Sequence, residues 1–172
     1  VVFVTWYTSY SEGECYNQIG FFRNGVLESA YSKEKLFPFF DYTPSWALEA
    51  GIISLPYDAS VGTNNTPYIL GGLSIGSLVC SEVSNEKATK NSAQGANMLF
   101  SLGSETMFSH EIPGEYNALR AQLSAERYNV PVMRANKFGP SVVYDRNGKE
   151  LGSLGYEETG ILYVDLPYTP YP

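Results

Sequence analysis

The chain has 172 residues, which at about 150 residues per domain predicts a single domain over residues 1–172. Eighteen acidic residues against eleven basic ones give a net charge of −7, so the chain lacks the positive field that a phosphate backbone requires, and we expect no nucleic-acid partner. One histidine and two cysteines exclude a histidine-rich metal site and a disulfide scaffold, and we expect neither a metal nor a cofactor. The sequence contains no apolar run of about 18 residues, which is the length that a membrane-spanning helix needs.

The first third of the chain is rich in β-branched and aromatic residues and predicts three strands. These cover residues 1–8, 16–22 and 26–32. Asn24-Gly25 separates the second strand from the third, and an Asn-Gly pair between two strand-like runs is the strongest short signal for a hairpin. Residues 36–44 then predict an ordered apolar loop, because Pro38 and Pro44 oppose regular structure.

The rest of the chain alternates further strands with short helices. Strand signal is predicted over residues 68–80, interrupted by Gly71-Gly72, and over residues 97–102, 130–135, 141–144, 150–154 and 160–164. Helices are predicted over residues 45–50, 84–94 and 115–128. Tyr116, Leu119 and Leu123 share one face of the last helix, which would begin after a Pro-Gly break. Asn147-Gly148 predicts a second hairpin, and the two hairpins favour a mixed or antiparallel sheet in an α/β fold.

Cys80 is the sharpest candidate for a catalytic residue. It ends an apolar strand and is followed by Ser81, Glu82 and a polar helix. A strand-to-helix turn exposes backbone N–H groups, which stabilise a thiolate and any oxyanion that develops beside it. The alternative is a buried structural cysteine, which is the commoner role of a free cysteine.

Lys33 and Asp41 are the candidate charged residues of the first part of the chain. Lys33 follows a predicted strand, where a partly desolvated lysine can act as an acid or as an oxyanion clamp. A solvated role beside Glu34 and Lys35 is the alternative. Asp41 lies between two aromatic residues and either pairs with a buried cation or caps the following turn.

Several short motifs follow one another in a fixed order along nearly the whole chain. They are Tyr31-Ser32-Lys33-Glu34-Lys35-Leu36-Phe37-Pro38-Phe39-Phe40-Asp41-Tyr42-Thr43-Pro44, Val79-Cys80-Ser81-Glu82, Gly95-Ala96-Asn97-Met98-Leu99, Pro131-Val132-Met133-Arg134-Ala135-Asn136-Lys137-Phe138-Gly139, Asp145-Arg146-Asn147-Gly148 and Thr169-Pro170-Tyr171. The ordered set resembles the segments Y-x-K-x-x-L-V-P-F-G-E-x-x-P, I-C-Y-E, G-A-D-x-L, P-x-x-R-A-x-N-x-G, D-x-x-G and T-P-Y of the apolipoprotein N-acyltransferases. These are membrane members of the nitrilase (carbon–nitrogen hydrolase) superfamily.

The resemblance implies a nitrilase-like αββα sandwich with a Glu-Lys-Cys catalytic triad. Cys80 would be the nucleophile, and the Lys33 ammonium with the backbone N–H of Ser81 would form the oxyanion hole. Asp41 and Glu82 occupy the positions of two supporting carboxylates. The triad glutamate would lie upstream of this sequence, so we expect a partial domain that lacks its N-terminal half and is inactive in isolation.

The implied activity is a two-step acyl transfer in the full-length parent. A phospholipid would give its acyl chain to Cys80 as a thioester, and the N-terminal amine of a lipidated cysteine on an apolipoprotein would receive it. Membrane helices outside this chain would hold the parent in the bacterial inner (cytoplasmic) membrane, with the catalytic domain on the periplasmic side. The alternatives are a soluble nitrilase-family amidase that uses the same Lys33 and Cys80, and a catalytically inactive remnant of the fold.

The chain departs from the family pattern at a few positions, which indicates a divergent member. Ser81 replaces a tyrosine, Phe40 a glycine, Val130 an arginine and Lys137 an asparagine, and Ser104-Glu105-Thr106-Met107-Phe108 replaces N-D-A-W-F.

Overall fold

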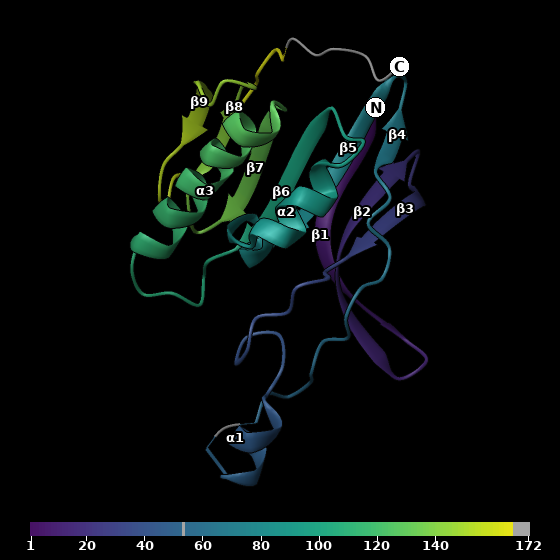
Figure 1. Cartoon of the computed structure of the whole chain (residues 1–172), viewed down its shortest axis with the longest axis vertical. Coiled ribbons are helices and arrows are strands. Elements are labelled where there is room, and N and C mark those ends of the chain that lie inside the picture. Colours follow the sequence, from purple (N-terminus) through teal and green to yellow (C-terminus); the bar gives the residue numbers. More distant parts are fainter. Residues whose placement is uncertain (53, 167–172) are drawn as a thin grey trace. The chain divides into compact units, whose positions relative to one another are not determined.

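Figure 1 shows the computed structural model of the chain, of which residues 1–52 and 54–166 are described. The chain divides into two compact units, the first covering Val1–Asn64 and the second beginning at Asn65. Each unit has a β-sheet of its own. The Thr169-Pro170-Tyr171 motif lies outside the described residues.

The first unit is built on a three-stranded antiparallel sheet. Its strands are β1 (Val2–Ser11), β2 (Glu14–Arg23) and β3 (Val26–Ser32), in the order β1-β2-β3. The predicted hairpin is confirmed, since Asn24 and Gly25 join β2 to β3 with φ values of 50° and 79°. Both residues adopt the left-handed conformation that a tight two-residue turn requires, which Asn and Gly tolerate best. Ile19 of β2 pairs with Tyr31 of β3, and both side chains are buried.

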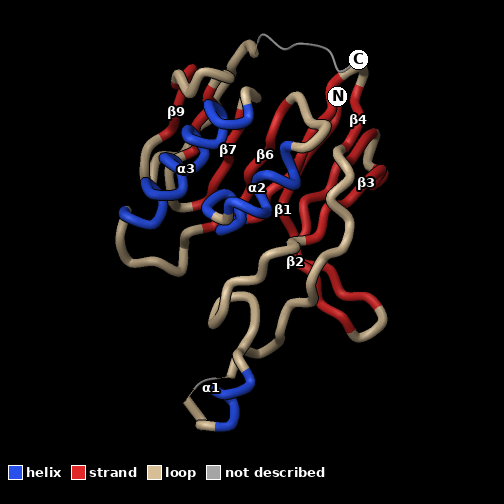
Figure 2. The backbone as a smooth tube through the Cα atoms, viewed as in Figure 1, coloured by secondary structure: helices blue, strands red, loops and turns tan. Residues whose placement is uncertain are grey.

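After β3 the first unit continues mostly as loop, which Figure 2 draws in tan. The predicted short helix is confirmed as α1 (Ser45–Glu49). The predicted loop over residues 36–44 is also confirmed, with a single isolated β-bridge between Pro38 and Tyr42. This loop contains Asp41 and begins three residues after Lys33, so its conformation decides what those two side chains contact.

The second unit has a six-stranded mixed sheet in the order β4-β5-β6-β7-β8-β9. Its strands are β4 (Tyr68–Leu70), β5 (Leu73–Val79), β6 (Met98–Ser104), β7 (Val132–Lys137), β8 (Ser141–Tyr144) and β9 (Glu150–Leu154). Strands β5, β6 and β7 run parallel and the other pairs run antiparallel, which confirms the predicted mixed sheet. The predicted strand signal over residues 68–80, interrupted at Gly71-Gly72, forms the hairpin of β4 and β5, in which Gly71 and Gly72 turn the chain at positive φ.

Three helical segments belong to the second unit. The 3-10 helix η1 (Cys80–Ser84) leads into α2 (Glu86–Ala93), and α3 (Ile112–Tyr128) connects β6 to β7. Figures 1 and 2 show α2 and α3 over one face of this sheet, where α2 contacts β5 and β6 and α3 contacts β7 and β8. The apolar core lies between these helices and the sheet, and it includes Leu78, Leu99 and Val132. Because β5 and β6 are neighbouring parallel strands, their carboxyl ends lie side by side, and Cys80 directly follows β5.

The apolar face of α3 is exposed. Tyr116, Leu119 and Leu123, which periodicity groups together, are 53%, 50% and 43% exposed. The helix packs on the sheet through small residues, which let the two backbones approach closely: Gly114, Ala118, Ala121, Ser124 and Ala125. The predicted start after the Pro-Gly break is wrong, because Pro113 lies in the first turn, where its missing N–H removes no helical hydrogen bond.

The predicted strand over residues 160–164 is wrong. This segment forms no strand, although Leu162 and Val164 lie against Gly152 of β9. A β-carbon placed on Gly152 would be 2.9 Å from Leu162 Cδ1. The alternating apolar residues thus pack through their side chains, with no backbone ladder to the neighbouring strand.

Asp145 holds the hairpin that joins β8 to β9. Its hydrogen bonds lead us to expect that the stability of the fold depends on pH. Its Oδ1 accepts the backbone N–H groups of Asn147 at 2.8 Å and of Lys149 at 2.9 Å. The hydrogen bond from Lys149 is the main reason why the pKa of Asp145 lies below its usual 3.8. Because the folded-state pKa is depressed, this contribution to stability is present above the usual pKa and is lost as the pH falls through the folded value.

We therefore expect Asp145→Ala to lower the melting temperature at about pH 7 and to lower it less at about pH 2, because the extra stability from the charged carboxylate is lost as the pH falls through the depressed folded-state pKa. Calorimetry at the two pH values measures this difference. A destabilisation that is the same at both would show that the charged form of Asp145 makes no special contribution.

Candidate active site

The first unit contains a buried ion pair between two of the predicted site residues. Lys33 is the first residue after β3, and its Nζ lies 2.5 Å from Oδ2 of Asp41. The two residues are only 2% and 6% exposed. Because an unpaired buried charge is costly, each of these residues accounts for the burial of the other. The solvated alternative for Lys33 is therefore wrong, and Asp41 is the partner of a buried cation.

Asp41 also orders the loop around this ion pair. Its Oδ1 accepts Nδ2 of Asn17 at 2.7 Å, and its Oδ2 accepts the backbone N–H of Phe37 at 2.6 Å. The backbone N–H of Lys33 donates to the carbonyl of Asn17 at 2.8 Å. The carboxylate thus links β2, the end of β3 and the following loop, and it holds the Lys33 ammonium in one place.

Cys80 lies in a strained turn between β5 and η1. Its φ is 52°, in the left-handed region that a residue with a β-carbon rarely adopts. A sharp turn of this kind between a strand and a helix lifts the side chain out of the sheet, as nucleophile turns in hydrolases do. The thiol is half-buried and lies 3.8 Å from the backbone carbonyl oxygen of Ser104, to which it donates a weak hydrogen bond.

Two neighbours support this turn. Glu82 is fully buried, and its Oε2 accepts the backbone N–H of Val79 at 2.8 Å across the start of the turn. Gly103 of β6 faces the turn, and a β-carbon added there would lie 2.8 Å from Cys80 Cα. Ser81 is the second residue of η1, so its N–H belongs to the first helical turn, where no preceding helical carbonyl is available to accept it.

A buried polar network lies beside this turn, and sequence reasoning did not identify it. Arg134 of β7 is 1% exposed, and its Nη2 donates to Oε1 of Glu105, which follows β6. Asn136 Nδ2 donates to Glu105 Oε2, and Asn117 Nδ2 of α3 donates to Oε1 at 2.9 Å. The available signal was an arginine among the apolar residues at the start of the segment that forms β7, and a glutamate directly after the segment that forms β6.

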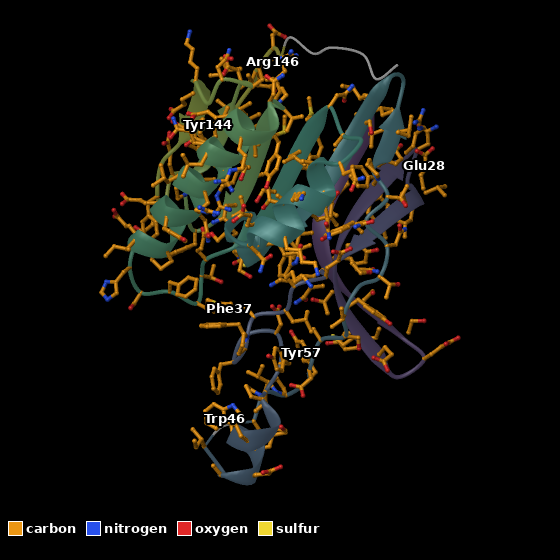
Figure 3. The ribbon with its side chains drawn as sticks, in the orientation of Figure 1. Glu28, Phe37, Trp46, Tyr57, Tyr144 and Arg146 are labelled. Atoms are coloured by element: carbon orange, nitrogen blue, oxygen red, sulfur yellow. The ribbon has the colours of Figure 1, made fainter. Side chains whose placement is uncertain are left out.

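Several aromatic side chains of the first unit are exposed. Phe37 stacks on Phe40 at a ring distance of 5.2 Å, and Phe39 meets Trp46 edge-on at 5.7 Å. Trp46, which lies on α1, is 57% exposed. Figure 3 shows Phe37, Trp46 and Tyr57 among the side chains of this part of the chain. We call residues 37–57 the aromatic segment.

The predicted site residues fall into two groups. Lys33 and Asp41 meet within the first unit, whereas Cys80, Ser81 and Glu82 follow one another within the second. That Lys33 and Cys80 act in one pocket stays a prediction. Among residues 1–52 and 54–166, no helix combines the length and the apolar character needed to cross a bilayer.

Comparison with known proteins decides the family. Residues 1–169 match the sequence profile of the carbon-nitrogen hydrolase family. The chain belongs to this family. Among solved structures, a carbon-nitrogen hydrolase from Helicobacter pylori G27 has a TM-score of 0.76 at 18% identity, covering 97% of this chain and 62% of that one. An amidase from Nesterenkonia sp. AN1 has a TM-score of 0.72 at 22% identity, covering 97% and 63%. The nitrilase-like fold expected for this carbon-nitrogen hydrolase is confirmed.

Curated relatives of this carbon-nitrogen hydrolase carry the name apolipoprotein N-acyltransferase. The relative from Agrobacterium fabrum is 32% identical over 149 residues, which are 83% of this chain and 28% of the relative. The relative from Pseudomonas syringae is 27% identical over 156 residues, which are 86% of this chain and 31% of the relative. The chain thus spans less than a third of the length of these relatives, and the resemblance seen in its motifs is confirmed.

Proposed function

We propose that this chain carries the nucleophile of an apolipoprotein N-acyltransferase that moves an acyl chain from a phospholipid to the N-terminal amine of a lipidated apolipoprotein. The strained turn that presents Cys80 is the observation that carries the proposal. A residue held at positive φ at the end of a buried strand is expensive to maintain, and such strain concentrates at functional sites. A buried structural cysteine would need no such turn.

The reaction proceeds in two steps. In the first, the Cys80 thiolate attacks the acyl ester of the phospholipid, a C–S bond forms, the C–O bond breaks and a lysophospholipid leaves. In the second, the acceptor amine attacks the thioester, a C–N bond forms and the C–S bond breaks. A carboxylate base takes the thiol proton and later the amine proton, and the proposal assigns this role to a residue outside the given sequence.

The oxyanion of each tetrahedral intermediate is stabilised by the backbone N–H of Ser81 and by the ammonium of Lys33. A lysine ammonium has three N–H donors, so the ion pair with Asp41 leaves donors for the oxyanion. Asp41 holds the Lys33 ammonium in place through this ion pair. Glu82 supports the site through the turn, because its carboxylate accepts the N–H of Val79.

The aromatic segment supports a lipid substrate. Exposed aromatic rings such as Phe39, Phe40 and Trp46 are typical of protein surfaces at the membrane interface, where one side of the ring is apolar and the other is wet. The proposed location is the periplasmic face of the bacterial inner membrane, where the acyl donor and the lipoprotein acceptor would both be present.

The test is the acylation of a diacylated lipopeptide by the full-length parent protein and by its Cys80→Ala variant. We expect Cys80→Ala to reduce turnover by about a thousandfold or more, because loss of a covalent nucleophile removes the whole first step. Mass spectrometry of the native protein, quenched in the absence of acceptor, should find an acyl group on Cys80. Cys15→Ala is the matched control, since Cys15 is buried in β2 and should be dispensable. Undiminished turnover in Cys80→Ala contradicts the proposal.

The Nesterenkonia amidase, a mutant of which shows Michael addition of acrylamide at the active-site cysteine, favours a second candidate. In a soluble amidase the same Cys80 would attack an amide and release an amine, and water would hydrolyse the thioester. Ammonia release from small amides without transfer to a lipopeptide would favour this second activity.

A further inference from the structure

The turn that carries Cys80 is part of a closed ring of contacts in the second unit. The ring passes from Cys80 to Ser104, on to Glu105, through Asn117 to Ser84, and back along η1 to Cys80. We call these five residues the Glu105 ring. Its members come from η1, the end of β6 and α3, so it joins three elements around one side chain.

One half of the ring determines which atom the thiol faces. Cys80 Sγ donates to the backbone carbonyl oxygen of Ser104 at 3.8 Å. The next residue is Glu105, whose backbone N–H donates to the carbonyl of Lys137 at 2.9 Å. Because Ser104 and Glu105 share a peptide unit, any displacement of Glu105 moves the carbonyl that the thiol faces.

The other half of the ring holds the end of the turn. Ser84, the last residue of η1, donates its hydroxyl to Oδ1 of Asn117 at 2.6 Å. Asn117 in turn donates Nδ2 to Oε1 of Glu105 at 2.9 Å. One carboxylate therefore acts on both ends of the turn, at Cys80 through Ser104 and at Ser84 through Asn117.

Arg134 and Asn136 keep this carboxylate in place. Glu105 is 2% exposed and accepts Nη2 of Arg134 and Nδ2 of Asn136. Over residues 1–52 and 54–166, the one ion pair of Arg134 is with Glu105, and its Nε and Nη1 have no hydrogen-bond partner. The buried guanidinium thus depends on Glu105 for compensation, which ties the ring to β7.

We propose that Glu105 is a positioning residue for Cys80, and that the Glu105 ring maintains the strained conformation in which the thiol is presented. A residue at φ 52° persists only when several independent contacts fix its conformation. The ring adds two such constraints to those from Gly103 and Glu82. This inference rests on the proposed role of Cys80 as nucleophile, and it assigns to Glu105 a role that acts through Ser104 and Asn117.

The test measures the thiol itself. Native protein, Glu105→Gln, Ser84→Ala and the double variant are treated with iodoacetamide under native conditions, and alkylation of Cys80 and Cys15 is followed by peptide mass spectrometry. We expect Cys80 to react about fivefold faster in Glu105→Gln and about twofold faster in Ser84→Ala, because the turn opens more often and the thiol loses its acceptor. The double variant should react no faster than Glu105→Gln, because both changes break the same ring. The rate at Cys15, in the other unit, should not change.

Ser74→Ala is the matched control. Ser74 is as buried as Glu105 and donates to the carbonyl of Gly95 at 2.6 Å, but it lies at the start of β5, away from the ring. It should lower stability without changing the Cys80 rate. If Glu105→Gln does not fold, Asn117→Ala replaces it, since this change cuts the link to Ser84 and leaves the ion pair with Arg134 intact.

Acyl transfer gives the second measurement. In Glu105→Gln we expect kcat to fall about tenfold with KM within about twofold of the native value, because a displaced nucleophile affects the chemical step and leaves substrate contacts unchanged. Cys80 rates that equal the native rate, or effects of the two changes that multiply independently, overturn the inference. A native protein that transfers no acyl group but shows the coupled Cys80 rates would contradict the proposed function and leave the positioning role of Glu105 supported.

Discussion

Asp41→Ala is expected to destabilise the first unit by about 3–5 kcal/mol, because it leaves the buried Lys33 ammonium without its counterion. The loss exceeds that of a surface ion pair because Lys33 is 2% exposed, so water cannot replace the carboxylate. The same change also frees the N–H of Phe37 and Nδ2 of Asn17. We expect the loop after β3 to lose its order with them.

Urea unfolding monitored by tryptophan fluorescence measures this effect. Both tryptophans of the chain, Trp6 and Trp46, lie in the first unit, so the signal reports that unit alone. Asp58→Ala is the matched control, because Asp58 lies in the same loop region and accepts one backbone N–H, that of Thr43 at 2.7 Å, but is exposed.

The double variant Lys33→Met with Asp41→Leu should recover most of the lost stability, because it removes both buried charges together. The double variant should still lack acyl transfer if Lys33 stabilises the oxyanion. A loss in Asp41→Ala no greater than that in Asp58→Ala would show that the ion pair contributes little to this unit.

Gly103→Ala is expected to disrupt the turn that carries Cys80. The added β-carbon would lie 2.8 Å from Cys80 Cα, 3.1 Å from its Cβ and 3.2 Å from its N. These are mainly backbone atoms of a strained residue, so the turn must shift as a whole. Overpacking of this kind costs about 1–3 kcal/mol, and here the displaced group is the proposed nucleophile.

Hydrogen exchange of β6 and η1 and the alkylation rate of Cys80 measure this displacement. Gly155→Ala is the control, because the nearest atom to its added β-carbon is Oε2 of Glu158 at 3.5 Å, an ordinary contact. We expect faster exchange and a changed alkylation rate in Gly103→Ala, and neither change in Gly155→Ala. Identical behaviour of the two variants would show that β6 can move away from the turn at little cost.

Local signals predicted most of the secondary structure correctly. The strand over residues 26–32 has the bounds of β3, and the strands over 141–144 and 150–154 have those of β8 and β9. Each of these lies beside an Asn-Gly turn or another short-range signal that acts within a few residues. The prediction for residues 160–164 was wrong because alternation of apolar residues cannot show whether a neighbouring strand accepts the backbone hydrogen bonds.

Local sequence patterns did not predict which face of α3 packs on the sheet. Apolar periodicity pointed to Tyr116, Leu119 and Leu123, yet the structure buries the alanines. Close packing favours the face whose side chains leave room for the sheet, and that choice depends on strands far away in the sequence.

The amino-acid sequence by itself determined the family, the mixed sheet and the place of Cys80 at the end of a strand, because ordered motifs and turn residues act over short stretches of chain. The tertiary structure alone decided which charges meet. Asp41 could have capped a turn and instead compensates Lys33, and Glu105 stood out only as a departure from a motif until its partners in β7 and α3 were known. Those partners are 29 and 12 positions away, and a buried charge is stable only where the fold brings its counterion to it.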